Sequence, residues 1–357
     1  MKKILFVVDK PNWAYEFMVM SWLPYLLKDY ECYVVYQEDL LIKRVNKSSL
    51  YKLLYNTFIE NEGRKIHKDG FFYSTNFEVY KYLNSDGQKE LIKTKPNKFN
   101  IIIEMAFYFQ YTAYLPFNSD KKIVGIFTDS FPHDGPTFDV KNNVDRRLYN
   151  RQEFFENYLK SYDHIFVGGG NLYKDYCEIT DKVSFVYGIY GEDKFIENSN
   201  VGLNENFVIG WTGNPNREMK GFKEFIEPAI IELKELGYKI DLKTKFSGPY
   251  DDLFSFYEDV DLVVIASSAD SGPSMYAEAC LSSVPVISTK IGLPLMGIEN
   301  NINGLFIERS KESIKEAIIK LYNDRELLNS YSKRVKTDYL KKLGNNNSVK
   351  NVLKNLQ

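Results

Sequence analysis

The sequence has few cysteines, no long apolar run and almost no net charge, and each of these shortages excludes a class of protein. Three of the 357 residues are cysteines, and no two of them have the spacing of a metal or redox pair. An odd number of cysteines, few and far apart, predicts reduced thiols in a cytoplasmic protein. No stretch reaches the roughly 18 apolar residues of a membrane-spanning helix. A formal net charge of −2 does not indicate a nucleic-acid-binding protein.

The first apolar run opens a pattern of alternating strands and helices. Ile4–Val8 is followed at once by Asp9 and Lys10, so it is too short for the apolar region of a signal peptide and is typical of a first strand. Similar runs recur through the first half with helical patterns between them, which predicts a doubly wound α/β domain. The expected strands of this half are Ile4–Asp9, Cys32–Tyr36, Asn100–Met105, Ile123–Thr128, His164–Gly168 and Val183–Tyr187.

A polar segment divides the pattern in two. Gly191–Asn206 is rich in glycine and asparagine, which predicts a linker between domains. Alternation restarts after it, with an expected strand at Phe207–Trp211, a helix near Phe222–Leu236 and a strand at Ile240–Lys243. We therefore expect a first Rossmann-like domain over residues 1–195, a second over residues 205–330, and a helical tail over residues 331–357.

The segment 261–289 carries the clearest local pattern. Apolar, β-branched residues predict buried strands at Asp261–Ser267 and Val284–Thr289. The loop Ser268–Pro273 lies between them, and Ser274 can cap the helix that follows the loop. Such a βαβ unit is parallel and right-handed, and ligands bind beyond the carboxyl ends of its strands.

Two carboxylates and a set of backbone amides fall at that predicted binding edge. Asp270 lies in the loop, and Glu278 lies in the second turn of the helix. The stretch Gly272, Pro273, Ser274 offers N–H groups at a helix N-terminus, where anions bind well. Carboxylates that accept sugar hydroxyls, beside amides that accept phosphates, suit a nucleotide-sugar. In the alternative interpretation Asp270 only closes a turn and Glu278 only faces solvent.

The residues that follow Asp270 form a recognisable series. Glu278-Ala279, Pro285-Val286-Ile287, Gly292 and Asn303-Gly304 come in this order. The series resembles the acid-x7-Glu motif of GT-B glycosyltransferases, most closely the retaining family 4 (group 1) enzymes. The first acid is usually glutamate there, so the shorter Asp270 implies a loop closer to the donor sugar. The resemblance implies two Rossmann-like domains facing a cleft, with the C-terminal helices packing back on the first domain.

Residues 207–222 place two cations at the end of another predicted strand. At this place family 4 enzymes have a Gly-Arg … Lys-Gly pattern, whose cations face the departing diphosphate. Lys220 and the glycine after it match the pattern. Asn214 follows Gly213 where arginine is usual, so Arg217 is expected to reach in from a shifted position. Preorganised cations stabilise the charge of such a leaving group. In the alternative, both are solvated charges of a surface loop.

Three further segments follow predicted strands of the first domain. The Asp-x-Pro-x-Trp-Ala pattern at residues 9–14 resembles a subgroup of bacterial surface-polysaccharide enzymes. Asn12 and Trp13 then border the acceptor, unless Trp13 belongs to the core. His133 is expected to replace the histidine that related enzymes hold near the donor sugar, unless it is an incidental loop residue. Gly168–Gly170 indicates close backbone approach rather than a dinucleotide fingerprint.

A basic stretch bears on where the protein acts. Residues 41–70 contain seven Lys or Arg against three acidic residues. With their apolar neighbours, these cations can bind an anionic lipid surface weakly. A solvated helix is the alternative that the pattern favours.

Motifs and resemblance together predict a metal-independent, retaining glycosyltransferase without a cofactor. It would move a hexose-type sugar from a UDP- or GDP-sugar to a hydroxyl of a glycan, lipid-linked or protein acceptor, in the cytoplasm or at the inner face of the membrane. The resemblance assigns the diphosphate to Lys220 and Arg217, the sugar hydroxyls to Asp270 and the ribose to Glu278. The alternatives are a nucleotide-sugar epimerase or phosphorylase on the same fold, and a non-catalytic sugar-binding subunit of a transferase pair.

Overall fold

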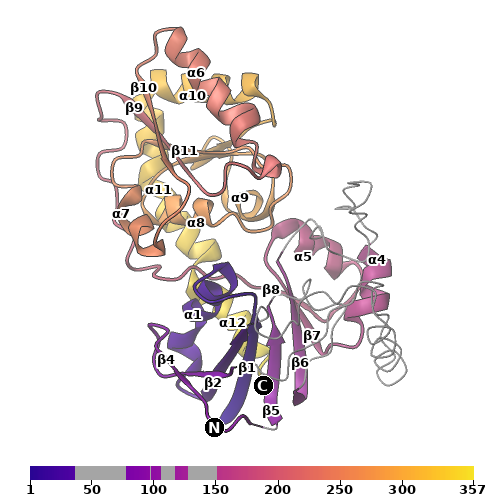
Figure 1. Ribbon diagram of the computed structural model, residues 1–357. Coiled ribbons are helices and arrows are strands. Elements are labelled where there is room, and N and C mark those ends of the chain that lie inside the picture. Colours follow the sequence, from indigo (N-terminus) through magenta and orange to yellow (C-terminus); the bar gives the residue numbers. More distant parts are fainter. Residues whose placement is uncertain (37–77, 97, 106–116, 128–150) are drawn as a thin grey trace, which may run out of the picture. The chain divides into compact units, whose positions relative to one another are not determined.

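The computed structural model describes residues 1–36, 78–96, 98–105, 117–127 and 151–357 (Figure 1). The chain divides into two compact units. Unit 1 consists of Met1–Gly168, Leu172–Tyr190 and Val349–Gln357, and unit 2 of Gly169–Asn171 and Gly191–Ser348. Each unit contains one β-sheet.

The sheet of unit 1 has eight strands among the described residues, in the order β4-β3-β2-β1-β5-β6-β7-β8. Six of them are parallel, while β3 and β4 are antiparallel additions at one edge. Apolar side chains of the central strand β1 are fully buried, from Ile4 to Val8. The bounds are β1 Lys2–Val8, β2 Tyr30–Tyr36, β3 Tyr80–Tyr82, β4 Lys89–Leu91, β5 Lys98–Glu104, β6 Asn118–Ile126, β7 His164–Val167 and β8 Val183–Phe185.

The helices of unit 1 pack apolar faces on this sheet. Trp22 of α1 is fully buried and its indole N–H donates to the Tyr187 carbonyl oxygen, 3.1 Å away. At the other end of the chain, Val352 and Leu356 are also buried, and the Asn351 amide donates to the Phe185 carbonyl. The bounds are α1 Ala14–Leu26, α4 Arg151–Phe154, a π-helical turn Phe155–Leu159, α5 Gly170–Cys177 and α12 Asn345–Lys354; the first residues of α5 and of α12 belong to unit 2.

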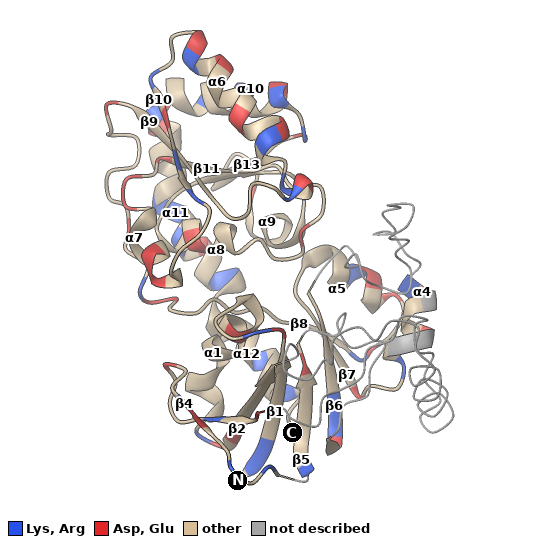
Figure 2. Ribbon diagram, in the orientation of Figure 1, with Lys and Arg blue, Asp and Glu red and all other residues tan. Residues whose placement is uncertain are grey.

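The sheet of unit 2 is entirely parallel, in the order β10-β9-β11-β12-β13. Strands β9, β11 and β12 carry no charged residue, whereas helices α6 and α10 carry charges of both signs (Figure 2). The parallel arrangement brings the carboxyl ends of all five strands to one edge of the sheet. The bounds are β9 Phe207–Thr212, β10 Ile240–Lys245, β11 Leu262–Ile265, β12 Val286–Ser288 and β13 Gly304–Phe306.

The helical segments of unit 2 connect these strands. Helix α8 is buried along almost its whole length, and α10 begins at a regular cap in which the Ser310 hydroxyl accepts from the Ser313 N–H. The bounds are α6 Glu227–Glu235, α7 Leu253–Phe256, α8 Ser274–Leu281, α9 Gly292–Gly297, α10 Lys311–Asn323 and α11 Arg325–Leu343, with 3₁₀ turns at Glu218–Lys220 and Tyr250–Asp252 and a π-helical turn at Phe222–Ile226.

The predicted fold class is confirmed, because each unit is α/β with a largely parallel sheet. The short strands β3 and β4 were not predicted. The segment expected to be a linker, Gly191–Asn206, packs within unit 2, where the Asn198 amide donates to the Val260 carbonyl at 2.8 Å. The last residues, Val349–Gln357, belong to unit 1, whereas α11 belongs to unit 2.

Candidate functional site

Lys220 and Asp270 form an ion pair at the carboxyl edge of the unit 2 sheet. Lys220 ends the 3₁₀ turn after β9, and Asp270 lies in the loop between β11 and α8. The Lys220 ammonium bonds to the Asp270 carboxylate, and the two side chains keep 19% and 15% of their surface exposed. The sequence placed both residues at this edge, and the structure brings them into contact. The pair is sheltered but open enough to exchange partners with a ligand.

The backbone of the Lys220 turn fits closely against the end of β11. Gly221 has a left-handed φ of +68°, and a Cβ atom there would lie 2.7 Å from the Ala266 carbonyl oxygen. The Ser268 N–H donates to the Met219 carbonyl at 2.8 Å. Only glycine tolerates both the dihedral angle and the close approach. This close fit fixes the position of the Lys220 backbone relative to the end of β11.

Arg309 makes a second connection between the same two segments. Its Nε donates to the Ala266 carbonyl at 3.0 Å and its Nη2 to the Glu218 carbonyl at 2.9 Å. The guanidinium also lies over the Phe225 ring, 4.6 Å from its centre. Sequence reasoning missed this residue. The available signal was its place just after β13, at the same carboxyl edge of the sheet.

Glu278 of α8 is buried, with 1% of its surface exposed, and lies within reach of the Lys220 charge. It accepts hydrogen bonds from the Tyr257 hydroxyl at 2.7 Å, the Thr212 hydroxyl at 3.5 Å and the Ser274 hydroxyl. Burial raises the pKa of Glu278, and these donors together with the Lys220 charge oppose the rise. Burial and the adjacent Glu278 charge hold the pKa of Tyr257 well above its ordinary value. Glu278 therefore does not simply face solvent.

The loop before α8 is packed rather than capped. The N-cap position is held by Pro273, and Ser274 is the first helical residue, so the prediction that Ser274 caps the helix was wrong. Its hydroxyl reaches forward to Glu278 instead. A Cβ on Gly292 would overlap the carbonyl oxygens of Asp270 and Ser271, so α9 presses directly on this loop. Gly272 lies half-buried at the turn.

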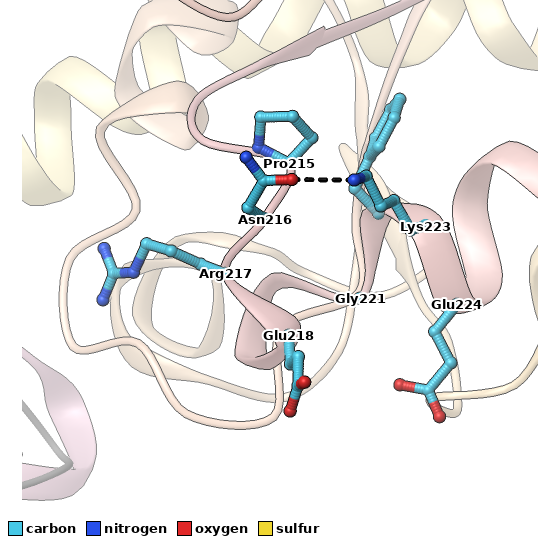
Figure 3. A pocket seen from close by; sticks show the side chains of 8 residues that line it. Pro215, Asn216, Arg217, Glu218, Gly221, Lys223 and Glu224 are labelled. Atoms are coloured by element: carbon cyan, nitrogen blue, oxygen red, sulfur yellow. Dashed lines mark hydrogen bonds between the residues drawn. The ribbon is translucent and has the colours of Figure 1, made fainter.

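Arg217 does not join the Lys220–Asp270 pair. It is exposed, and its Nη2 lies 3.1 Å from the Met219 sulfur. A cavity of about 250 Å³ lies against the same turn, lined by Pro215 to Glu218 and Gly221 to Glu224. Figure 3 shows Arg217 pointing away from the hydrogen bond that joins the Lys223 ammonium to the Asn216 amide oxygen at 2.7 Å. None of the ion pair's residues lines this cavity.

The remaining candidate residues either make only local contacts or lie outside the described residues. Gly213 has a φ of +128° and is exposed, and the Asn214 side chain accepts from the Asn216 N–H within its own turn. His133 lies outside the described residues, as does the basic stretch 41–70. Within the described part of the chain, no three His, Cys, Asp or Glu side chains gather as a metal site would require. No helix there is both long and apolar enough to cross a membrane.

The sequence and fold of this chain are similar to those of known glycosyltransferases. Residues 222–338 match the family model described as Glycosyl transferases group 1. No curated protein sequence matches the chain. Among similar solved structures are TarM of S. aureus (14% identity, TM-score 0.59, covering 100% of this chain and 99% of that one) and sucrose-phosphate synthase of Thermosynechococcus elongatus (10%, 0.63, 99% and 98%).

A third similar structure is HepE of Anabaena (11% identity, TM-score 0.55, covering 100% of this chain and 99% of that one). At identities this low, the likeness shows a shared fold and nothing more. The shared fold extends over the whole chain. The chain therefore has the GT-B fold, and its residues 222–338 are similar to the Glycosyl transferases group 1 family.

Proposed function

We propose that this protein is a retaining, metal-independent glycosyltransferase that uses a nucleoside-diphosphate-sugar. The observation that carries the proposal is the Lys220–Asp270 pair, whose lysine charge also acts on the buried Glu278 of α8. The match of residues 222–338 to a glycosyltransferase family supports it. HepE is described in complex with UDP and with UDP-glucose, which favours a UDP-sugar as the first donor to test.

The diphosphate is assigned to Lys220 and to the backbone amides at the start of α8. In this proposal the leaving phosphate gains its negative charge next to the Lys220 ammonium, and the helix N-terminus adds N–H donors. Asp270 then exchanges its bond with Lys220 for bonds to the sugar hydroxyls. Arg217 is exposed, so it contributes only if the turn at Asn214 rearranges when ligand binds. His133 keeps its proposed place near the donor sugar.

Glu278 is assigned to the ribose. Two of its hydrogen bonds come from the fully buried Tyr257 and the partly buried Thr212, which hold the carboxylate in place. The third comes from Ser274, which is exposed and can rotate its hydroxyl away. A ribose hydroxyl would take the position that Ser274 vacates. The buried carboxylate therefore stays satisfied in both the free and the bound state, as buried charge requires.

The transfer needs no group beyond the donor's own phosphate. The bond between the anomeric carbon and the phosphate oxygen breaks, and the acceptor oxygen bonds to the same face of that carbon. The acceptor proton passes to the departing phosphate oxygen. Lys220 stabilises the charge that develops there. Removing a comparable preorganised donor from an enzyme costs roughly 3–4 kcal/mol of transition-state stabilisation.

The test combines binding with product stereochemistry. Thermal shifts are measured with UDP, GDP, ADP and CMP on the wild type and on Lys220→Ala. A nucleotide at about 100 times its dissociation constant stabilises by roughly 2.7 kcal/mol. We expect one diphosphate to stabilise the wild type and the variant to lose that shift. Lys223→Ala, whose ammonium bonds only to the exposed Asn216 among the described residues, is the matched control and should keep it.

Transfer is then followed from the donor that binds, with and without EDTA. We expect the anomeric configuration to be retained and the rate to be insensitive to EDTA. An inverted product, or a rate abolished by EDTA and restored by Mn²⁺, would contradict the proposal. Binding without any turnover would indicate the non-catalytic subunit instead.

A further inference from the structure

The loop Asp9–Trp13 occupies the switch point of the unit 1 sheet. Along the chain, strands are added on one side of β1 up to β4, and the next strand, β5, joins its other side. Ligands of doubly wound sheets bind outside the carboxyl ends of the strands at such a reversal. The loop follows β1 directly and opens α1. Its position is therefore that of a binding loop.

A buried carboxylate holds this loop in a fixed shape. Glu16 of α1 is completely buried, and its Oε2 accepts from the Asn12 N–H at 2.7 Å. Asn12 itself has a left-handed φ of +55°, which is uncommon for a residue with a side chain. The other oxygen of Glu16 accepts from three side chains, contributed by β2, β3 and β4: Tyr36 at 2.6 Å, Tyr82 at 3.0 Å and Lys89 at 2.7 Å.

The shape of the loop presents one aromatic ring to solvent. Trp13 is 52% exposed, while the other two tryptophans, Trp22 and Trp211, are 0% and 1% exposed. The Lys10 ammonium lies 3.7 Å from the centre of the Trp13 ring. No carboxylate of the described residues forms an ion pair with Lys10. The interpretation of Trp13 as a core residue is therefore wrong. The loop offers an exposed indole with a cation over its ring.

We propose that Trp13 and Lys10 form a binding site for a saccharide that carries an anionic group. The C–H face of a pyranose is polarised positive by its oxygens and packs on the negative face of an indole ring. The Lys10 ammonium lies over one face of this ring, so the sugar displaces it from that face and the ammonium pairs with a phosphate, sulfate or carboxylate on the sugar. That this saccharide is the acceptor of the transfer rests on the proposed function, whereas its binding here does not.

The neighbours of Trp13 favour a sugar over a lipid surface. Pro11, Asn12 and Ala14 are exposed and offer little apolar area for insertion into a bilayer. Interfacial binding instead needs a broad apolar face flanked by several cations. A rigid loop is also better suited to a saccharide, because no ordering entropy has to be spent when the ligand arrives.

The fluorescence of Trp13 provides the test, since it is the exposed tryptophan of the three. The probes are tetragalacturonate and a chondroitin sulfate tetrasaccharide, with neutral maltotetraose for comparison. We expect the anionic probes to shift the emission to shorter wavelength and to protect it from acrylamide, and maltotetraose to do so about tenfold more weakly. Vesicles of anionic lipid are titrated in parallel.

Variants separate the two contributions when binding is measured by calorimetry. Trp13→Phe should bind within a few-fold of the wild type but lose the fluorescence change, and Trp13→Ala should bind at least about tenfold more weakly. Lys10→Met should remove the preference for anionic probes. Lys2→Met is its matched control, because Lys2 lies exposed at the opposite end of β1.

Each other outcome overturns the inference. It fails if neither anionic probe binds at about 10 mM, if Trp13→Ala binds like the wild type, or if only vesicles shift the emission. The nucleotide thermal shift is recorded on the same samples. Saccharide binding without a nucleotide shift refutes the proposed function but not this site, and the reverse result refutes this site alone.

Discussion

Replacing Arg309 with methionine tests whether the position of Lys220 depends on the connection between β11 and the turn before it. Methionine keeps much of the aliphatic stem that packs near Phe225, but it removes both donors to the carbonyls of Ala266 and Glu218. The remaining contacts of the turn, at Gly221 and between Ser268 and Met219, are left intact. The lysine should therefore become less ordered rather than be lost from the site.

The magnitude follows from the two hydrogen bonds. Each is a bond from a charged donor, of a kind that contributes roughly 1.5–3 kcal/mol when sheltered. The Arg309 side chain is 29% exposed, so water replaces part of that energy. We expect a loss of about 1–2 kcal/mol in the free energy of unfolding. The nucleoside diphosphate should bind about 3- to 10-fold more weakly, a smaller change than Lys220→Ala produces.

A double-mutant cycle supplies the assay. The dissociation constant of the diphosphate is measured calorimetrically for the wild type, Arg309→Met, Lys220→Ala and the double variant. If Arg309 acts through Lys220, its replacement should change binding by less than about twofold once Lys220 is absent. Equal effects in both backgrounds would refute the reasoning, because Arg309 would then act on the ligand directly. Arg334→Met, in an exposed ion pair of α11, should leave binding unchanged.

Three further predictions concern stability. Gly237 and Gly221 both have left-handed φ angles, but a Cβ on Gly237 meets nothing within 4 Å. We therefore expect Gly237→Ala to cost about 1 kcal/mol in urea denaturation and Gly221→Ala to cost more and to abolish diphosphate binding. Burial lowers the pKa of His164 to about 4, so the folded protein binds fewer protons than the unfolded chain between pH 6.5 and 4. Stability should fall by up to about 3 kcal/mol as the pH drops through that window, and the His164→Gln variant should not show this loss. Tyr257→Phe removes a donor from the buried Glu278. It should cost about 1.5–3 kcal/mol near pH 8, and the cost should shrink as the pH falls, because the raised pKa of Glu278 makes the carboxylate take up a proton at a higher pH than an ordinary glutamate; a cost that does not change with pH would contradict this.

The parts of the fold that could be predicted are those written in short stretches of sequence. Strand β11, helix α8 and strand β12 follow one another within the segment 261–289, so the pattern of apolar residues and the turn between them sufficed. Lys220 and Asp270 could be placed for the same reason, since each follows a strand whose carboxyl end is fixed by parallel topology. Their direct contact needed only that β9 and β11 be neighbours.

The parts that could not be predicted depend on contacts without a residue code. Arg309 bonds to backbone carbonyls, which any residue could supply. The direction of Arg217 is set by the turn between β9 and Glu218, whose sequence allows several conformations. Ser274 has the composition of a cap, but the proline before it already occupies that position.

The charged cluster around Glu16 could not be predicted from the sequence for a related reason. Its partners come from strands far along the chain, and two of these strands are short, polar and antiparallel. Such strands lack the alternation of apolar and polar residues from which strands are predicted. Their side chains Tyr82 and Lys89 instead bond to the buried carboxylate of Glu16.

The division of the chain into units has a consequence for its synthesis. Unit 1 begins at the N-terminus, yet its core includes Val349, Val352 and Leu356, which are made only after all of unit 2. Domains made on the ribosome usually fold in order from the N-terminus. Here the residues that complete the core of unit 1 are synthesised last. All residues of unit 2 are synthesised before those last residues of unit 1. The nascent chain therefore carries an unfinished first unit through most of its translation.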